Sequence, residues 1–397
     1  MCLHLFYFAA QPISTVIRYI LYLVFGFVPI ACSQSSGSNR AIANKPDPKH
    51  TDFVFRAMSD GEKEYYTNAI KNYYNARYGR YFNGCVLVAK NGEILFEDYK
   101  GIYDFKTKEP ITEHTPFHLA SISKTFTAMT ILKLWEEHRL SLDDTLQKYF
   151  PKLPYRGITI KMLLDHRSGL PNYLYFMDSI WNKKQKATNW DVVNFMNQHQ
   201  PRPMSFPDRG YHYCNTNYLL LALIVEIVTT QPFPQYMKDS VFMPLGMKDS
   251  YIFCIADTGK YIPTYSVTRP FPMDHLDCTY GDKNVYSTVR DLFLWDKALY
   301  EHTFVSKATE DIAFTPYSNE HKTMHNYGLG WHLYFNNGDT LIYHNGKWHG
   351  SNTAFTRVVK DTATIIMLGN KINNNIYRSR EMETIFTGKE DKNQLEE

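Results

Sequence analysis

The sequence predicts an α+β fold in which strands from the two ends of the chain form one antiparallel sheet, flanked by helices and interrupted by a helical insertion. Two observations predict it. Apolar and polar residues alternate with a period of two near both ends of the region 83–370, and the long segment between is mostly helical and rich in loops. The chain of 397 residues, 44% of them hydrophobic, can bury a substantial core in one large or two interleaved domains.

The first two predicted strands form a hairpin. The segments CVLVAK (85–90) and EILFEDY (93–99) lie on either side of Asn91 and Gly92. An Asn-Gly pair favours a two-residue hairpin turn, because both residues tolerate positive φ. We therefore expect two antiparallel strands at the start of the domain.

Three further strands are predicted near the other end of the chain. They are DTLIYHNG (339–346), TAFTRVVK (353–360) and ATIIMLGN (363–370), the last two joined by a turn at 360–362. In the insertion, 219–228 is almost wholly apolar and 291–299 is amphipathic, which is typical of helices. The simplest assembly pairs the strands from the two ends in one sheet.

The N-terminal residues 1–32 have the pattern of a signal peptide. A single cation, Arg18, precedes an apolar segment at 19–31, which is shorter than the ~20 residues that a membrane-spanning helix needs. The end of this segment resembles a bacterial lipoprotein cleavage site, at which Cys32 becomes the lipidated first residue. A signal without lipid and a retained anchor helix are the alternatives. We expect an exported protein that is either anchored to a membrane through its N-terminus or periplasmic.

The domain boundaries follow from these segments. Residues 33–60 are expected to be a flexible polar tether, 61–375 the folded domain and 376–397 a charged C-terminal tail.

Charge and cysteine content exclude several kinds of partner. The net charge is only +3, and Lys and Arg are scattered, so no nucleic-acid surface is indicated, and a small-molecule or peptide substrate is the better expectation. Four cysteines lie beyond the N-terminal segment without CxxC spacing, which favours free thiols and leaves one Cys254–Cys278 disulfide open. His321 and His325 lack the glutamate of an HExxH pattern, so no metal site and no cofactor are predicted.

Ser121 and Lys124 lie three residues apart at the start of an apolar helical segment. In a helix that begins near Ser121, Lys124 lies one turn further on the same face, so its amine can approach the serine oxygen. A serine hydroxyl needs a neighbouring base, and a lysine serves as one only when burial or nearby cations lower its pKa. An N-cap serine followed by a solvated lysine is the alternative.

A series of motifs decides between these interpretations. In chain order they are PFHLASISKTFTA (116–128), LSLDDTLQKYFP (140–151), ITIKMLLDHRSGLPNY (158–173), YCNTNYLLLALIVE (213–226) and YHNGKWHG (343–350). Over residues 83–370 this series resembles the serine β-lactamase and penicillin-binding-protein superfamily, in particular its class C-like branch. The resemblance implies that Ser121 is the nucleophile and Lys124 its base, and that His166 belongs to the scaffold.

The resemblance also implies roles for two residues in the second motif. Tyr213 shares the proton with Lys124 or carries it to the leaving group, and the amide of Asn215 orients the substrate carbonyl. Several other tyrosines begin a Tyr-x-Asn triplet, and only the position after the SxxK helix singles out Tyr213.

The third motif departs from the Lys-Thr-Gly pattern. His344, Asn345 and Gly346 take its place, and the backbone N–H groups of Lys347 and Ser121 are expected to form the oxyanion hole. An ordinary histidine is mostly neutral at pH 7 and gains its proton near pH 6, so affinity for carboxylate-bearing penicillins is in doubt. The side chain of Lys347 restores the charge if it faces the cleft.

The function expected from these residues is hydrolysis of an ester, amide or lactam carbonyl through an acyl-enzyme at Ser121. Two alternatives stay open. One is a true β-lactamase, and the other is a penicillin-binding or sensor protein of the cell envelope that is acylated without turnover.

Overall fold

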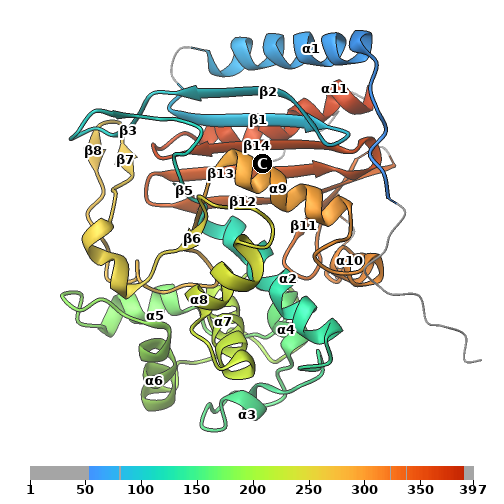
Figure 1. Ribbon diagram of the computed structural model, residues 1–397. Helices are drawn as coiled ribbons and strands as arrows, with labels where there is room; N and C mark the ends of the chain where they lie inside the picture. The colour runs from blue at the N-terminus through green and yellow to red at the C-terminus, as the bar shows by residue number, and fades with distance from the viewer. Residues whose placement is uncertain (1–52, 80–81, 322, 337, 389–397) are drawn as a thin grey trace, which may run out of the picture. The chain divides into compact units, whose positions relative to one another are not determined.

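A seven-stranded antiparallel sheet organises the part of the chain that the structure describes (Figure 1). The computed structural model describes residues 53–79, 82–321, 323–336 and 338–388, all within the unit Asp47–Glu397. The strand order is β10-β11-β12-β13-β14-β1-β2. The strands are β1 (Gly84–Lys90), β2 (Glu93–Lys100), β10 (His325–Tyr327), β11 (His332–Asn336), β12 (Asp339–Trp348), β13 (Ser351–Val358) and β14 (Ala363–Gly369).

The predicted pairing of strands from the two ends of the chain is confirmed. β1 lies antiparallel to β14, with Gly84 opposite Gly369 and Lys90 opposite Ala363. Asn91 and Gly92 both have positive φ, as a two-residue hairpin turn between twisted strands requires. Short β10 and β11 extend the sheet beyond β12, and neither was expected from the sequence.

Helices cover both faces of the sheet, which is why all seven residues of β1 are buried. Alternate side chains of the strand point to opposite faces. Val86 and Val88 pack beneath α1 (Asp60–Tyr78), η5 (Asn374–Met382) and α11 (Glu383–Thr387). Cys85 and Leu87 belong to the larger core on the other face, which α9 (Val289–Tyr300) helps to form.

The predicted helical insertion between β2 and β10 is also present, and Figure 1 shows its helices α2 to α8 below the sheet. Its remaining α-helices are α2 (Ser123–Glu136), α3 (Leu146–Tyr149), α4 (Ile160–Leu164), α5 (Tyr173–Ile180), α6 (Asn189–His199), α7 (Asn215–Thr229), α8 (Phe233–Met237) and α10 (Lys307–Ala313). Its short strands are β3 (Ile102–Asp104), β4 (Glu109–Pro110), β5 (Phe117–His118), β6 (Tyr251–Ile252), β7 (Tyr265–Ser266), β8 (Arg269–Pro270) and β9 (Val285–Ser287).

The central helix of the insertion is α7. Every residue from Thr216 to Val225 is buried, as expected of a helix that is apolar on all sides. It packs against α2, so the first residues of these two helices lie close together.

At two of the expected domain boundaries, the packed part of the chain extends further than the sequence indicated. The tail expected from residue 376 begins later, because η5 and α11 pack on the sheet with Ile376 and Met382 fully buried. The tether expected to extend to residue 60 ends earlier, because the rings of Phe53 and Phe55 contact Tyr300. The expected signal peptide, Cys32 and residues 389–397 lie outside the described residues.

Two further observations concern the cysteines and the membrane. The four cysteines within the described ranges are free, so the open Cys254–Cys278 disulfide is not formed. Among the same residues, no single helix is long and apolar enough to cross a membrane. Taken together, α7 and the segment Phe233–Phe242 have the required length and composition, but the pair is bent by 79°.

Replacing Met382 by Ala is predicted to lower the free energy of unfolding by about 2–5 kcal/mol, because this fully buried side chain packs in the core between η5 and the sheet. Urea denaturation measures the change. The matched control is Ile372→Ala, since Ile372 is 45% exposed on the preceding connection and its loss should cost under about 0.5 kcal/mol. Equal stability of wild type and Met382→Ala would contradict the revised C-terminal boundary.

Candidate active site

Ser121 lies in a 3-10 turn directly before α2, not within the α-helix itself. The turn is η1 (Ala120–Ile122), and α2 begins at Ser123. Ala120 has a φ of +49°, a left-handed conformation that is unfavourable for a residue with a Cβ and persists only where the surroundings hold it. One such restraint is the hydroxyl of Thr353 on β13, which donates to the Leu119 carbonyl oxygen at 2.8 Å.

Gly346 allows strand β12 to lie directly against this turn. A Cβ at position 346 would overlap the Leu119 carbonyl oxygen and the Thr353 hydroxyl, and it would press on the Ala120 methyl group. Only glycine lets the two backbones approach so closely. The strand expected beside the nucleophile is therefore in contact with the turn that carries Ser121.

The Lys124 amine lies beside the Ser121 hydroxyl and is fully buried. Its Nζ is 3.0 Å from Ser121 Oγ, 2.8 Å from Asn215 Oδ1 and 2.8 Å from the backbone oxygen of Asp282. Burial lowers the pKa of Lys124 to about 8, and the negative charge of Asp282 opposes this shift. An amine with that pKa is neutral in about one molecule in ten at pH 7 and in about half at pH 8.

Tyr213 lies next to Ser121 and Lys124, two residues before the start of α7. The centre of its ring is 4.9 Å from Lys124 Nζ. Burial raises the pKa of the phenol well above its usual value, and a hydrogen bond with the Ser121 side chain opposes the rise. The phenol is therefore neutral at physiological pH, although 36% of the residue is exposed. It can donate or pass on a proton beside Ser121.

Asn215 is the first residue of α7, which places its side chain at the same point. Its Oδ1 accepts from Lys124 at 2.8 Å, so the amide nitrogen is the group that remains to donate to a substrate.

His344 is buried beneath this site, and its chemistry differs from the expectation. It is 1% exposed, and its Nδ1 lies 2.8 Å from the Asn345 carbonyl oxygen, to which it donates. Nε2 therefore accepts from the hydroxyl of Tyr327 at 3.3 Å. Burial, followed by His332 and Lys124, lowers the pKa of His344 well below its usual value. The expectation that His344 gains its proton near pH 6 is wrong, because no charged partner offsets its loss of solvent.

Lys347 does not supply the missing charge at this position. Its side chain is exposed, and it points to the opposite face of β12 from Gly346, because neighbouring residues of a strand alternate. The structure thus brings Ser121, Lys124, Tyr213 and Asn215 into one cluster, with Gly346 against it and His344 below. The side chain of Lys347 is the one that lies apart.

Comparison with known proteins gives the family. The family model described as Beta-lactamase matches residues 76–379, more than half of the chain. The chain belongs to the β-lactamase family. The predicted resemblance to the superfamily of serine β-lactamases and penicillin-binding proteins is confirmed, and family members of this fold are serine hydrolases.

Individual relatives agree with this membership. Penicillin-binding protein 4* of Bacillus subtilis is 33% identical over 308 residues, covering 73% of this chain and 68% of its own. Protein flp of Staphylococcus aureus (strain MRSA252) is 28% identical over 308 residues, covering 72% of this chain, which spans only 58% of the length of flp. The crystal structure of D-amino acid amidase from Ochrobactrum anthropi SV3 has a TM-score of 0.65 at 24% identity, covers 81% of this chain and 97% of its own, and shows the shared fold.

Two further groups contribute to this β-lactamase-family site, one not identified from the sequence and one identified only as scaffold. The first is the backbone oxygen of Asp282, which fixes Lys124 but carries no side-chain signal that a motif could reveal. The second is His166, interpreted only as scaffold. Its Nδ1 accepts from the backbone N–H of Cys214 at 3.1 Å, and its ring centre is 4.4 Å from that of Tyr213. His166 therefore supports the tyrosine from below.

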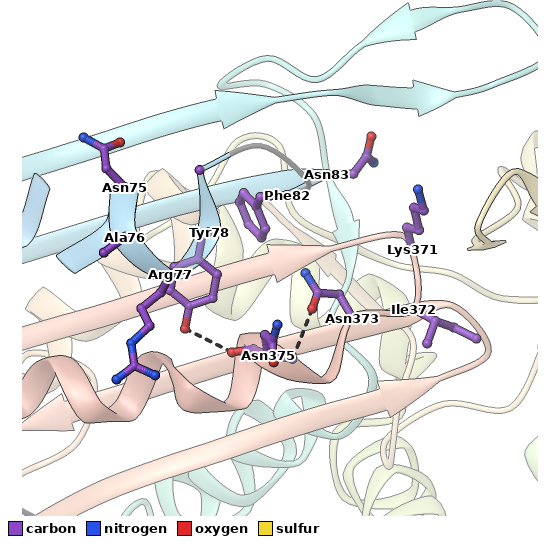
Figure 2. Close-up of a pocket in the computed structure, with 11 residues that line it drawn as sticks. Asn75, Ala76, Arg77, Tyr78, Phe82, Asn83, Lys371, Ile372, Asn373 and Asn375 are labelled. Atoms are coloured by element: carbon purple, nitrogen blue, oxygen red, sulfur yellow. Dashed lines mark hydrogen bonds between the residues drawn. The ribbon is translucent and has the colours of Figure 1, made fainter. Parts of the chain in front are cut away.

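A separate cavity of about 500 Å³ lies between the end of α1 and the start of η5, away from these residues (Figure 2). Its polar groups are largely engaged within the fold. The Tyr78 hydroxyl donates to the Asn375 carbonyl oxygen at 3.0 Å, and the Asn375 N–H donates to Asn373 Oδ1 at 3.1 Å. Among the described residues that line it there is no serine, threonine or cysteine, so the cluster around Ser121 is the better candidate.

Replacing Gly346 by Ala is predicted to lower the free energy of unfolding by about 1–3 kcal/mol, because the added methyl group forces β12 away from the turn at Leu119. Urea denaturation measures the loss. The matched control is Gly259→Ala, where a Cβ would meet nothing within 4 Å. A Gly346→Ala protein as stable as that control would contradict the close contact between β12 and η1.

Proposed function

We propose that the protein is an exported serine hydrolase that forms an acyl-enzyme at Ser121. The observation that carries the proposal is the fully buried Lys124 amine, 3.0 Å from Ser121 Oγ and with its pKa lowered to about 8. A serine hydroxyl beside such an amine has the base that it needs to act as a nucleophile.

The contacts of Lys124 suit the neutral form of its amine. Asn215 Oδ1 and the Asp282 backbone oxygen can only accept hydrogen bonds. They bind two N–H groups, which are all that a neutral amine has. Its lone pair then faces Ser121 Oγ, in the direction from which the hydroxyl proton arrives. The arrangement therefore supports Lys124 as general base for acylation.

The proposed reaction has two halves. Ser121 Oγ bonds to the substrate carbonyl carbon as its proton passes to Lys124, and the bond to the leaving atom then breaks as Tyr213 or Lys124 returns a proton to that atom. Water attacks the resulting ester, releases the acid and restores the Ser121 hydroxyl. The backbone N–H groups of Ser121 and Lys347 are the proposed donors to the carbonyl oxygen, since Gly346 brings β12 against the nucleophile turn.

Acylation through a lysine base has a defined dependence on pH. Only the neutral amine accepts the proton, so the rate should rise about tenfold per pH unit well below the lowered pKa of about 8 and level off above it. His344 does not contribute to this profile, because burial keeps its imidazole neutral.

Esters and amides are the proposed substrates in preference to penicillins. A penicillin carries a carboxylate, and the cluster offers it neither a charged His344 nor the side chain of Lys347. The similar fold of D-amino acid amidase supports an amide or peptide substrate. β-Lactam hydrolysis, and acylation without turnover, are the outcomes that the following experiment distinguishes.

Ser121→Ala is predicted to abolish covalent labelling by a fluorophosphonate and by substrate, because Ser121 supplies the nucleophile in the proposed reaction. Intact-mass spectrometry after exposure to short-chain esters, D-amino-acid peptides and a penicillin reports each adduct and its lifetime. The wild type should label at one site and turn over esters or amides faster than the penicillin.

The control is Ser123→Ala, the neighbouring buried serine, whose hydroxyl accepts from the Val285 N–H at 3.0 Å and takes no part in the chemistry. It should still label when folded. Adducts that persist in folded Ser121→Ala would contradict the nucleophile assignment. A long-lived adduct without product in the wild type would identify a binding protein instead of a hydrolase.

We further propose that residues 1–32 direct export and that Cys32 becomes lipidated in a bacterial host. The support is the sequence pattern, an apolar segment at 19–31 that ends at Cys32. Residues 33–52 then link the lipid to the folded domain as a polar tether.

Wild-type protein expressed in a bacterium is predicted to partition into the detergent phase of Triton X-114, and Cys32→Ser into the aqueous phase, because the lipid attaches only at the cysteine. Cys2→Ser is the matched control and should behave as wild type. Aqueous partitioning of all three would mean that no lipid is attached at Cys32.

A further inference from the structure

A second cavity adjoins the Ser121 cluster on the side of Tyr213. Its volume is about 630 Å³, and its lining includes Tyr211, Tyr327, His332, Tyr343 and Arg209. These residues come from the loop before α7 and from the strands β10, β11 and β12. The cavity is large enough for a bicyclic aromatic group, and it is unrelated to the pocket beneath α1.

Ring contacts join the cavity wall to the active site. The ring centre of Tyr213 lies 6.4 Å from that of His332 and 6.5 Å from that of Tyr327. Tyr211 lies two residues before Tyr213 and contacts Tyr327 at 5.5 Å. Tyr213 is therefore the boundary between the Ser121 hydroxyl and the cavity.

The position of Tyr213 indicates which part of a substrate enters the cavity. Where Tyr213 is the group that returns the proton in the proposed reaction, the leaving atom lies beside its phenol, so the group bonded to that atom extends past the phenol. Along β12, Tyr343 pairs with His332 of the cavity wall and comes before His344. Lys347, which with Ser121 is a proposed oxyanion donor, comes after His344. The cavity thus lies on the leaving-group side of the scissile bond.

Three aromatic rings of the cavity wall, those of Tyr211, Tyr327 and His332, are uncharged. Burial lowers the pKa of His332 to about 3, so its imidazole is neutral at physiological pH. Burial raises the pKa values of Tyr211 and Tyr327 well above the usual value, so both phenols keep their protons. Flat, neutral rings favour stacking with another aromatic group.

One cation at the cavity is not neutralised. Arg209 is exposed and has no ion-pair partner among the residues that the structure describes. Asp208 is its neighbour in sequence, and Glu320 is a carboxylate of the cavity wall. Both carboxylates pair with Arg167. An anionic substituent at the mouth of the cavity would therefore meet an available guanidinium group.

We propose that this cavity is a leaving-group subsite that selects substrates whose leaving group has a flat aromatic body and an anionic substituent directed to Arg209. The inference rests on the proposed hydrolase function of Ser121. It goes beyond that function because it states which leaving groups the enzyme prefers, that is, which alcohol or amine it releases. The acyl group of the substrate is not specified.

The experiment compares acetate esters, which share one acyl group, and measures kcat/KM for the full protein. 2-Naphthyl acetate and hexafluoroisopropyl acetate test shape, because their alcohols have similar acidity. Wild type should prefer the naphthyl ester at least about tenfold. His212→Trp, which fills the rim of the cavity, should remove most of that preference without slowing the smaller ester.

Charge is tested with phenyl acetate, 3-acetoxybenzoate and 3-acetoxy-N,N,N-trimethylanilinium. Arg209→Glu should lower the ratio of kcat/KM for the anionic ester to that for phenyl acetate about tenfold, and raise the ratio for the cationic ester. Arg202→Glu is the matched control, because Arg202 is an exposed arginine of the same loop outside the cavity and its replacement makes the same change in net charge.

The outcomes separate the two proposals. Hydrolysis of every ester through Ser121 with no naphthyl preference, or equal effects of Arg209→Glu and Arg202→Glu, would overturn the subsite and leave the hydrolase function intact. Failure of all the esters to acylate Ser121 would overturn both. The expected ratios, unchanged in Arg202→Glu, would establish the subsite.

Discussion

The burial of the Lys124 amine is the constraint on which the rest of the site depends. An unpaired ammonium group costs several kcal/mol to remove from water, so a buried lysine needs acceptors for every N–H or loses its proton. Here two neutral acceptors, Asn215 Oδ1 and the Asp282 backbone oxygen, satisfy two N–H groups. The third position around the amine nitrogen faces Ser121 Oγ. The fold therefore holds the base near its point of deprotonation, next to the hydroxyl that it activates.

The architecture keeps this arrangement in place from two sides. From the sheet, Gly346 and Thr353 hold the strained turn at Ala120, which sets the direction of the Ser121 side chain. From the insertion, α7 places Asn215 at its first residue, with Tyr213 just before it. Because α7 is buried on nearly all sides, the Asn215 side chain has little freedom to move away from Lys124, and the ring of Tyr213 packs on that of His166.

Much of this could be predicted from sequence because its signals are local. The hairpin at Asn91 and Gly92, the period-two strands and the SxxK spacing each depend on residues that are neighbours in the chain. The errors arise where tertiary contacts decide. The burial of His344 depends on rings from β10 and β11, strands too short for a periodic signal, and the contribution of Asp282 comes from its backbone. The C-terminal helices were missed because asparagines precede Ile376 and charged residues flank Met382.

Direct titration of the Lys124 amine by NMR tests whether its pKa is lowered enough for it to act as a general base. Protein labelled with ¹³C at lysine Cε gives one resonance per lysine, and its absence in Lys124→Met assigns the signal of interest. We expect a titration midpoint near 8 for this resonance in the folded protein. A Lys124 signal that keeps the shift of an ammonium group up to pH 10 would show that the amine is charged at working pH, and it would contradict the role of Lys124 as general base.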